Sequence, residues 1–129
     1  MAFLTIERDG GILTATMNQP ETRNALTGNT AVQEFVQLCE DVRKDASVKV
    51  LIITAAGPIF SSGGNVKDMK RFFDDALTPD LIREEYRQGI QQIPNALVQL
   101  DVPVICAISG PAIGAGLDLT SMCDIRTAS

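Results

Sequence analysis

The fold of this 129-residue chain is decided by the stretch Pro103-Val104-Ile105-Cys106-Ala107-Ile108-Ser109-Gly110-Pro111-Ala112-Ile113-Gly114-Ala115-Gly116-Leu117-Asp118. Its first half is a β-branched apolar run of the kind found in strands that are buried on both faces. Its second half is a glycine-rich turn that leads into a predicted helix over residues 117–122. The same order occurs earlier, where the apolar run 48–54 precedes a loop with Gly63 and Gly64 and a short predicted helix over 66–73. Two strand–turn–helix units therefore share one small chain.

The remaining segments extend this alternation. Residues 3–8 and 12–17 alternate apolar and polar residues around Gly10-Gly11, which predicts a β-hairpin. A helix is expected to begin within 27–30, after a loop held by Pro20, and another to begin near residue 79, where Pro94 either kinks it or opens a new helix. A last strand is expected over 124–127. The order predicts one α/β domain with a largely parallel sheet.

Composition limits the function. Hydrophobic residues make up 45% and charged residues 21%, which are ordinary values for a globular domain. A net charge of −5 argues against a nucleic-acid or anionic-membrane surface. The absence of histidine excludes Ser–His and Cys–His dyads and histidine metal sites, and no metal is expected. Three widely spaced cysteines indicate free thiols in a reducing compartment, so we expect a cytoplasmic protein without a membrane segment.

The two glycine-rich turns are the candidate chemistry. Backbone N–H groups at helix starts lack intrahelical partners, and glycine lets a ligand approach them closely. Neither turn matches the dinucleotide or P-loop patterns. For one such turn alone, packing of strand against helix is the favoured explanation, and the presence of two such turns in one small domain weakens it.

Three segments together resemble the crotonase superfamily, which contains enoyl-CoA hydratases and isomerases. They are 18–26 (Asn-Gln-Pro-Glu-Thr-Arg-Asn-Ala-Leu), 57–66 (Gly-Pro-Ile-Phe-Ser-Ser-Gly-Gly-Asn-Val), and the block from Pro103 to Ile125 that includes Cys123-Asp124. The resemblance implies a crotonase-like spiral of β-β-α units, of which residues 1–129 would be the N-terminal part, and a homo-oligomer, a trimer or a dimer of trimers, when full length.

The resemblance also implies an acyl-CoA thioester as substrate, with coenzyme A as part of it and no separate cofactor. The family holds the thioester oxygen with two backbone N–H groups, which transfer to Ser62 and Ala115. The residues expected to bind substrate and CoA are Arg23, Ala25, Leu26, Ser62, Gly63, Gly64, Asn65, Val66, Gly114 and Ala115. Arg23 is the candidate phosphate contact, although an exposed loop arginine needs no such role. Asn65 replaces the family's usual Asp and retains the ability to cap a helix.

Asp118 occupies the family's first acid–base position. Its neighbours Ile113, Leu117 and Leu119 are apolar, so we expect burial to raise the pKa of its carboxyl group. A simple partner of the helix dipole is the alternative. Hydratases usually carry Glu here, whereas dienoyl-CoA isomerases carry Asp. Asp124 is expected to be structural.

Three functions remain open. The resemblance places the second carboxylate of the hydratases beyond Ser129, so the first hypothesis is the N-terminal part of an enzyme that hydrates a trans-2-enoyl-CoA. The second is an enoyl-CoA or dienoyl-CoA isomerase of the same family. The third is a non-catalytic truncated fragment, and we expect the 129-residue segment alone to be inactive.

Overall fold

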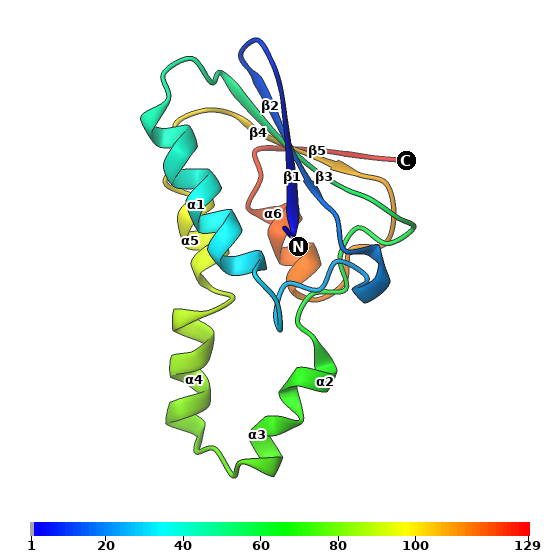
Figure 1. Ribbon diagram of the computed structural model, residues 1–129, viewed down its shortest axis with the longest axis vertical. Coiled ribbons are helices and arrows are strands. Elements are labelled where there is room, and N and C mark those ends of the chain that lie inside the picture. Colours follow the sequence, from blue (N-terminus) through cyan, green and yellow to red (C-terminus); the bar gives the residue numbers. More distant parts are fainter. Residues whose placement is uncertain (1) are drawn as a thin grey trace.

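A five-stranded sheet forms the centre of the structure, a computed structural model that describes residues 2–129 (Figure 1). The strands are β1 (Leu4–Asp9), β2 (Ile12–Met17), β3 (Val50–Ala55), β4 (Val104–Ile108) and β5 (Ile125–Ala128), in that spatial order. Strands β1 and β2 form the expected antiparallel hairpin, and the pairs β2–β3, β3–β4 and β4–β5 are parallel. The predicted α/β class with a largely parallel sheet is confirmed.

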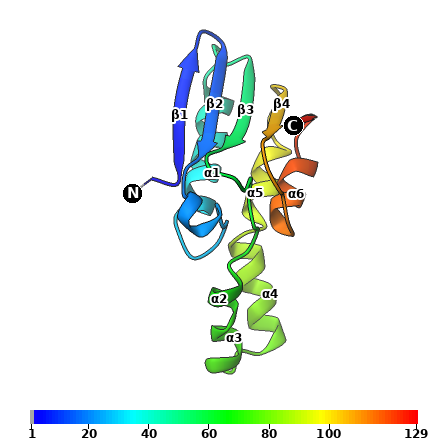
Figure 2. The ribbon, with the colours of Figure 1, turned by 90° about the vertical axis from the view of Figure 1, so that its right-hand side faces the viewer.

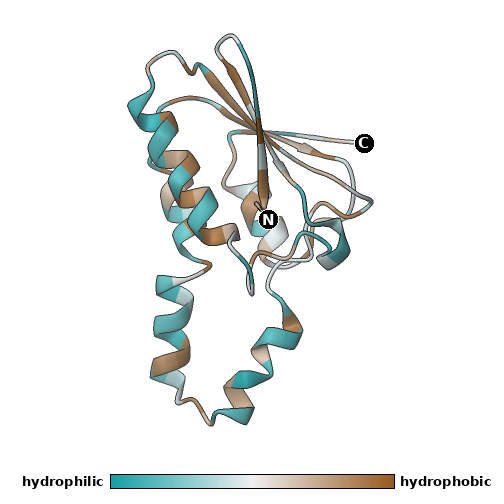
Figure 3. Ribbon diagram, in the orientation of Figure 1, coloured by the Kyte–Doolittle hydropathy of each residue, from teal (hydrophilic) through white to brown (hydrophobic). Residues whose placement is uncertain are grey.

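Helices α1 (Ala31–Lys44), α5 (Gln92–Leu97) and α6 (Ala115–Ser121) lie on one side of the sheet (Figure 2). The strands alternate accordingly, with Leu13, Leu51 and Val104 in register across three of them on the covered face. The strands are mainly apolar, whereas α1 alternates apolar and polar residues along its length (Figure 3). Burial of this single apolar face supplies the main stabilisation of the fold.

Helix α1 begins one residue later than expected, at Ala31. The side-chain Oδ1 of Asn29 accepts a hydrogen bond from the Ala31 N–H (3.0 Å) and so satisfies one of the unpaired amides of the first turn. Glu34 then accepts hydrogen bonds from the backbone N–H groups of Phe3 (2.7 Å) and Leu4 (3.0 Å). A carboxylate on the helix therefore fixes the start of β1. The loop between β2 and α1 contains a short 3₁₀ turn, Pro20–Thr22.

Three helices project from this body as an arm, which we define as α2 (Val66–Met69), α3 (Arg71–Asp74) and α4 (Pro79–Gln88) (Figures 1 and 2). The single helix expected over 66–73 is therefore wrong, because the chain forms two short helices that meet at Lys70. The helix expected from residue 79 ends before Gly89, which leaves helical geometry (φ −111°, ψ −116°). Pro94 lies in the first turn of α5, so of the two alternatives it opens a new helix.

The arm has little apolar support. Leu81, expected on the apolar face of its helix, is 52% exposed, and no residue of α4 is buried.

No helix among residues 2–129 is long and apolar enough to cross a membrane.

Candidate functional site

The two glycine-rich turns lie against each other at the carboxyl ends of β3 and β4. The Phe60 N–H donates to the Pro111 carbonyl (3.0 Å), and the Ile113 N–H donates to the Ser61 carbonyl (3.0 Å). Gly116 allows this approach, because a Cβ there would lie 2.5 Å from the Ser61 carbonyl oxygen. The site thus follows the general rule that ligands of parallel sheets bind at the carboxyl ends of the strands.

The early loop is fixed to the first of these turns. The Leu26 N–H donates to the Gly63 carbonyl (2.8 Å), and the Ser61 hydroxyl donates to the Asn24 carbonyl (2.8 Å). Ala25 and Leu26 are both buried, at 3% and 1% exposure. All three segments that carry the crotonase resemblance therefore meet at one place.

Asn24 organises this meeting point, a role that its sequence pattern did not predict. It is fully buried in the left-handed region (φ 52°), which asparagine tolerates better than most residues. Its Oδ1 accepts from the Gln19 N–H (2.8 Å), and its Nδ2 donates to the carbonyls of Ala56 (2.9 Å) and Ile59 (3.1 Å). An asparagine in a turn-rich loop was the available signal, but two of its partners, Ala56 and Ile59, lie more than 30 residues away.

The backbone N–H groups of the first turn differ in their availability. The Ser62 N–H donates to the Arg23 carbonyl (3.0 Å), the Gly63 N–H to the Ser61 hydroxyl (3.1 Å), and the Asn65 N–H to the Thr27 hydroxyl (2.7 Å). Within residues 2–129, the Gly64 N–H has no partner. The choice of Ser62 as a donor therefore needs correction, because its amide is already used and the amide of Gly64 is free.

In the second turn the predicted donor is available. Ala115 is the first residue of α6, and its N–H is unpaired in the described part of the chain, as is that of Gly114. Gly114 has φ 57° and ψ −124°, a conformation that a residue with a side chain rarely adopts. The start of α6 thus presents two neighbouring unpaired N–H groups, those of Gly114 and Ala115, next to the glycine-rich turn that contains Gly63 and Gly64.

Two hollows adjoin these donors. The arm pocket, about 330 Å³ in volume, lies between the body and the arm, and Gly64, Leu26 and Ile90 contribute to its wall. The α6 pocket, about 80 Å³, is lined by Ala115 and Asp118 together with the same Leu26 and Ile90. The two hollows are therefore neighbours that share one apolar wall, with Gly64 in the lining of one and Ala115 in the lining of the other.

Asp118 lines the α6 pocket, but its expected burial is wrong. The residue is exposed, whereas Leu119 and Thr120 form the buried side of α6. The apolar neighbours that suggested burial do not cover the carboxylate, because Ile113 and Leu117 are themselves 56% and 54% exposed. Asp118 is nevertheless the only ionisable side chain among the described residues that line this pocket.

The other predicted residues have simpler positions. Asn65 caps α2 as expected, since its Oδ1 accepts from the N–H groups of Lys67 (3.0 Å) and Asp68 (3.3 Å). Val66 is 77% exposed and lines neither of the two pockets. The Arg23 side chain is also exposed and forms no ion pair within residues 2–129. Arg23 is thus available to a ligand.

The structure confirms two expectations, a structural role for Asp124 and free cysteine thiols. The Asp124 carboxylate accepts a hydrogen bond from the Val104 N–H (2.8 Å) and so joins the end of α6 to β4, which is a structural role. Cys39, Cys106 and Cys123 are free and buried. Burial raises the pKa of the Cys39 thiol to about 11.

The fold and the paired strand–turn–helix units define an α/β protein with backbone donors at the carboxyl edge of a parallel sheet. A family model described as "Enoyl-CoA hydratase/isomerase" matches residues 7–129. The chain belongs to the enoyl-CoA hydratase/isomerase family, and the resemblance to the crotonase superfamily is confirmed.

Individual relatives are similar along nearly all of this chain. A Mycobacterium leprae protein named "Probable enoyl-CoA hydratase echA6" is 31% identical over 98% of the chain and 48% of its own length. The mouse mitochondrial Delta(3,5)-Delta(2,4)-dienoyl-CoA isomerase is 33% identical over 89% of the chain and 36% of its own length. The crystal structure of an enoyl-CoA hydratase from Mycobacterium smegmatis superposes with a TM-score of 0.86, at 28% identity, over 99% of this chain and 48% of that one. The chain spans about half the length of these relatives or less.

Proposed function

We propose that this site binds an acyl-CoA thioester, stabilises its enolate, and serves the hydration of a trans-2-enoyl-CoA. The observation that carries the proposal is the pair of contacting turns whose Gly64 and Ala115 N–H groups are unpaired within residues 2–129. Two such donors aimed at one thioester oxygen act on charge that appears only as the enolate forms, which is worth about 3–4 kcal/mol for a donor in comparable sites. Ser62 is replaced by Gly64 in this role.

The reaction requires one addition and two proton transfers. The oxygen of water adds to C3 of the enoyl group while a base removes one proton from that water, the electron pair of the double bond moves through C2 to the thioester oxygen, and the resulting enolate accepts a proton at C2. Asp118, beside Ala115 in the α6 pocket, is the group proposed to exchange the C2 proton. The positioning of the water would need a second group, which the family resemblance assigns to a segment beyond Ser129.

An isomerase is the second candidate, and one observation favours it. Asp118 is the only ionisable side chain lining the α6 pocket in the described structure. A single carboxylate can remove a proton from one carbon of an enolate-forming substrate and return it to another, which shifts the double bond without adding water. The similarity to a mouse dienoyl-CoA isomerase is consistent with this chemistry.

Nuclear magnetic resonance tests the binding proposal directly. Titration of the ¹⁵N-labelled chain with butyryl-CoA should move the amide signals of Gly64 and Ala115 most, with little change at Ser62. Equal or larger shifts at Ser62, or no binding at all, would contradict the assignment. Incubation with crotonyl-CoA and with a 3-enoyl-CoA then separates the reactions, because a hydratase forms 3-hydroxybutyryl-CoA and an isomerase moves the double bond.

Assembly and compartment belong to the same proposal. A homo-oligomer of the complete protein is supported by the exposure of large apolar residues on α6 and β5, where Leu117 is 54% and Ile125 is 52% exposed. Light scattering after size-exclusion chromatography measures the mass of the assembly. A cytoplasmic location stays a prediction from the free cysteines.

A further inference from the structure

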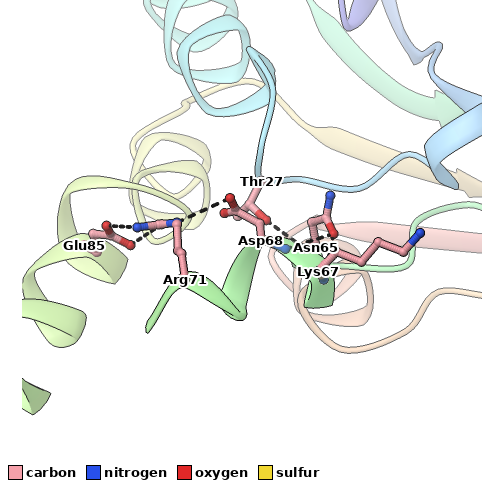
Figure 4. A network of polar contacts seen from close by, with 6 residues as sticks. All are labelled: Thr27, Asn65, Lys67, Asp68, Arg71 and Glu85. Carbon is pink, nitrogen blue, oxygen red and sulfur yellow. Dashed lines mark hydrogen bonds and ion pairs between the residues drawn. The ribbon is translucent and has the colours of Figure 1, made fainter. Parts of the chain in front are cut away.

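The wall of the arm pocket carries an ion-pair cluster that the proposed chemistry does not use. The Arg71 guanidinium of α3 forms a bidentate pair with the Glu85 carboxylate of α4, and its Nε lies 3.3 Å from Oδ1 of Asp68 (Figure 4). All three side chains line the pocket that also contains Gly64. The cluster therefore faces the same space as a proposed backbone donor.

The cluster is built on the same helix start as the donor turn. Asn65, directly after Gly64, accepts hydrogen bonds from the Lys67 and Asp68 N–H groups, and Asp68 in turn contacts Arg71. Figure 4 shows Asn65 and Glu85 at opposite ends of this series, with Asp68 and Arg71 between them. A ligand whose thioester oxygen is held at Gly64 would thus share the pocket with this cluster.

Aromatic contacts hold the guanidinium in place. The carbon at the centre of the Arg71 guanidinium lies 4.9 Å from the ring centroid of Phe72, and the rings of Phe72 and Tyr86 are 6.2 Å apart. These rings line the same pocket. Arg71 is therefore stacked as well as paired, and it does not need a ligand carboxylate to be satisfied.

The charges of the side chains that line the arm pocket indicate which ligands it disfavours. Besides Tyr86, the ionisable side chains lining the described pocket are one cation, Arg71, and two carboxylates, Glu85 and Asp68. The cluster carries one surplus negative charge at neutral pH. Because Arg71 and Glu85 are each 39% exposed, the resulting field is partly screened but acts at short range.

We infer that the Arg71–Glu85–Asp68 cluster makes the arm pocket selective for uncharged acyl groups and disfavours acyl groups that end in a carboxylate. The inference rests on the proposed function, with C2 beside Asp118 in the α6 pocket and the distal acyl chain continuing into the arm pocket, because Leu26 and Ile90 line both hollows. Glu85 is the specificity-determining residue, because it occupies two of the guanidinium donors that an incoming carboxylate would need and repels that carboxylate.

Calorimetric titration of the full chain with two matched ligands tests the inference. The ligands are octanoyl-CoA and the CoA monothioester of octanedioic acid, which differ by a terminal carboxylate. The wild type should bind octanoyl-CoA about tenfold more tightly, and this preference should decrease as ionic strength rises. Glu85→Gln should reduce this preference, measured as the ratio of the two affinities, by about fivefold. Glu84→Gln is the matched control, because it makes the same charge change on α4 at an exposed residue outside the pocket.

The outcomes separate the two proposals. If the wild type binds both thioesters equally, or if Glu84→Gln changes the preference as much as Glu85→Gln, the inference is overturned and the proposed function stands. If neither thioester binds the wild type, the proposed function fails and the inference fails with it. Octanoyl-CoA binding by Glu85→Gln also shows that this variant is folded.

Discussion

Gly63 and Ala115 are packed so closely that a Cβ on Gly63 would lie 2.8 Å from the Ala115 backbone nitrogen. The same Cβ would lie 2.7 Å from the Ile113 carbonyl oxygen. At Gly63 the two turns therefore touch through backbone, and this contact constrains the positions of the proposed donors of Gly64 and Ala115. A small residue at position 63 is a requirement of the site and of the fold together.

Gly63→Ala should lower the free energy of unfolding by about 3 kcal/mol, because the new methyl group meets rigid backbone and the residue has φ 84°. Urea denaturation measures the change. Gly10→Ala is the matched control: its φ is 59°, but nothing lies within 4 Å of the added carbon, so only the backbone strain of about 1 kcal/mol is expected. Equal losses in the two variants would refute the close contact of the turns.

Asn24→Ala should destabilise the protein by about 3 kcal/mol, since it removes a fully buried side chain and leaves the partly buried carbonyls of Ala56 and Ile59 without their donor. Chemical denaturation provides the measurement. Asn18→Ala serves as control, because the exposed Asn18 side chain makes one long hydrogen bond to the Thr5 hydroxyl (3.4 Å) and should cost less than about 0.5 kcal/mol. A loss at Asn24 as small as that at Asn18 would show that the loop is not held by this residue.

The predicted strands agree with the structure to within about two residues, because each is specified by its own apolar pattern. The arm was predicted less well. Its breaks at Lys70 and Gly89 lie in segments without buried residues, so neither apolar periodicity nor packing constrains them.

The site residues show the same division between local and distant information. The order of a strand, a glycine-rich turn and a helix is enough to predict that the turns present backbone donors. This order does not predict which amide is free, because the Ser62 N–H donates to the Arg23 carbonyl, 39 residues earlier. The exposure of Asp118 likewise depends on which side of α6 faces the sheet, and its apolar sequence neighbours were misleading.

Arg23→Gln should weaken the binding of free CoA by about fivefold, with a smaller effect at high salt, if the exposed guanidinium contacts a CoA phosphate. Isothermal titration calorimetry at two salt concentrations measures this. Arg87→Gln makes the same charge change on the exposed surface of α4 and is expected to leave CoA affinity unaltered. If both variants lose the same CoA affinity, the loss comes from the change in net charge and not from a contact of Arg23 with CoA.

Cys39 should be nearly inert in the native protein. Burial raises the pKa of its thiol to about 11, so only about one molecule in a thousand carries the reactive thiolate at pH 8. Mass spectrometry after brief treatment with iodoacetamide should find residue 39 unmodified in buffer and modified in urea. Rapid alkylation of residue 39 in the native state would contradict the packing of α1 against the sheet.

Asp118→Asn should slow proton exchange at C2 of butyryl-CoA in deuterated water by about 10²–10⁴-fold relative to the wild type. Because Asp118 is exposed, the free energy of unfolding should change by less than about 0.5 kcal/mol, and the affinity for butyryl-CoA should be retained. Asp124→Asn should do the opposite, since this carboxylate accepts the Val104 N–H: it should destabilise the fold and leave exchange per folded molecule intact. If the wild type exchanges the C2 proton at a measurable rate and Asp118→Asn exchanges it equally fast, Asp118 does not transfer that proton. A wild type that binds butyryl-CoA without exchanging it would instead support the non-catalytic fragment.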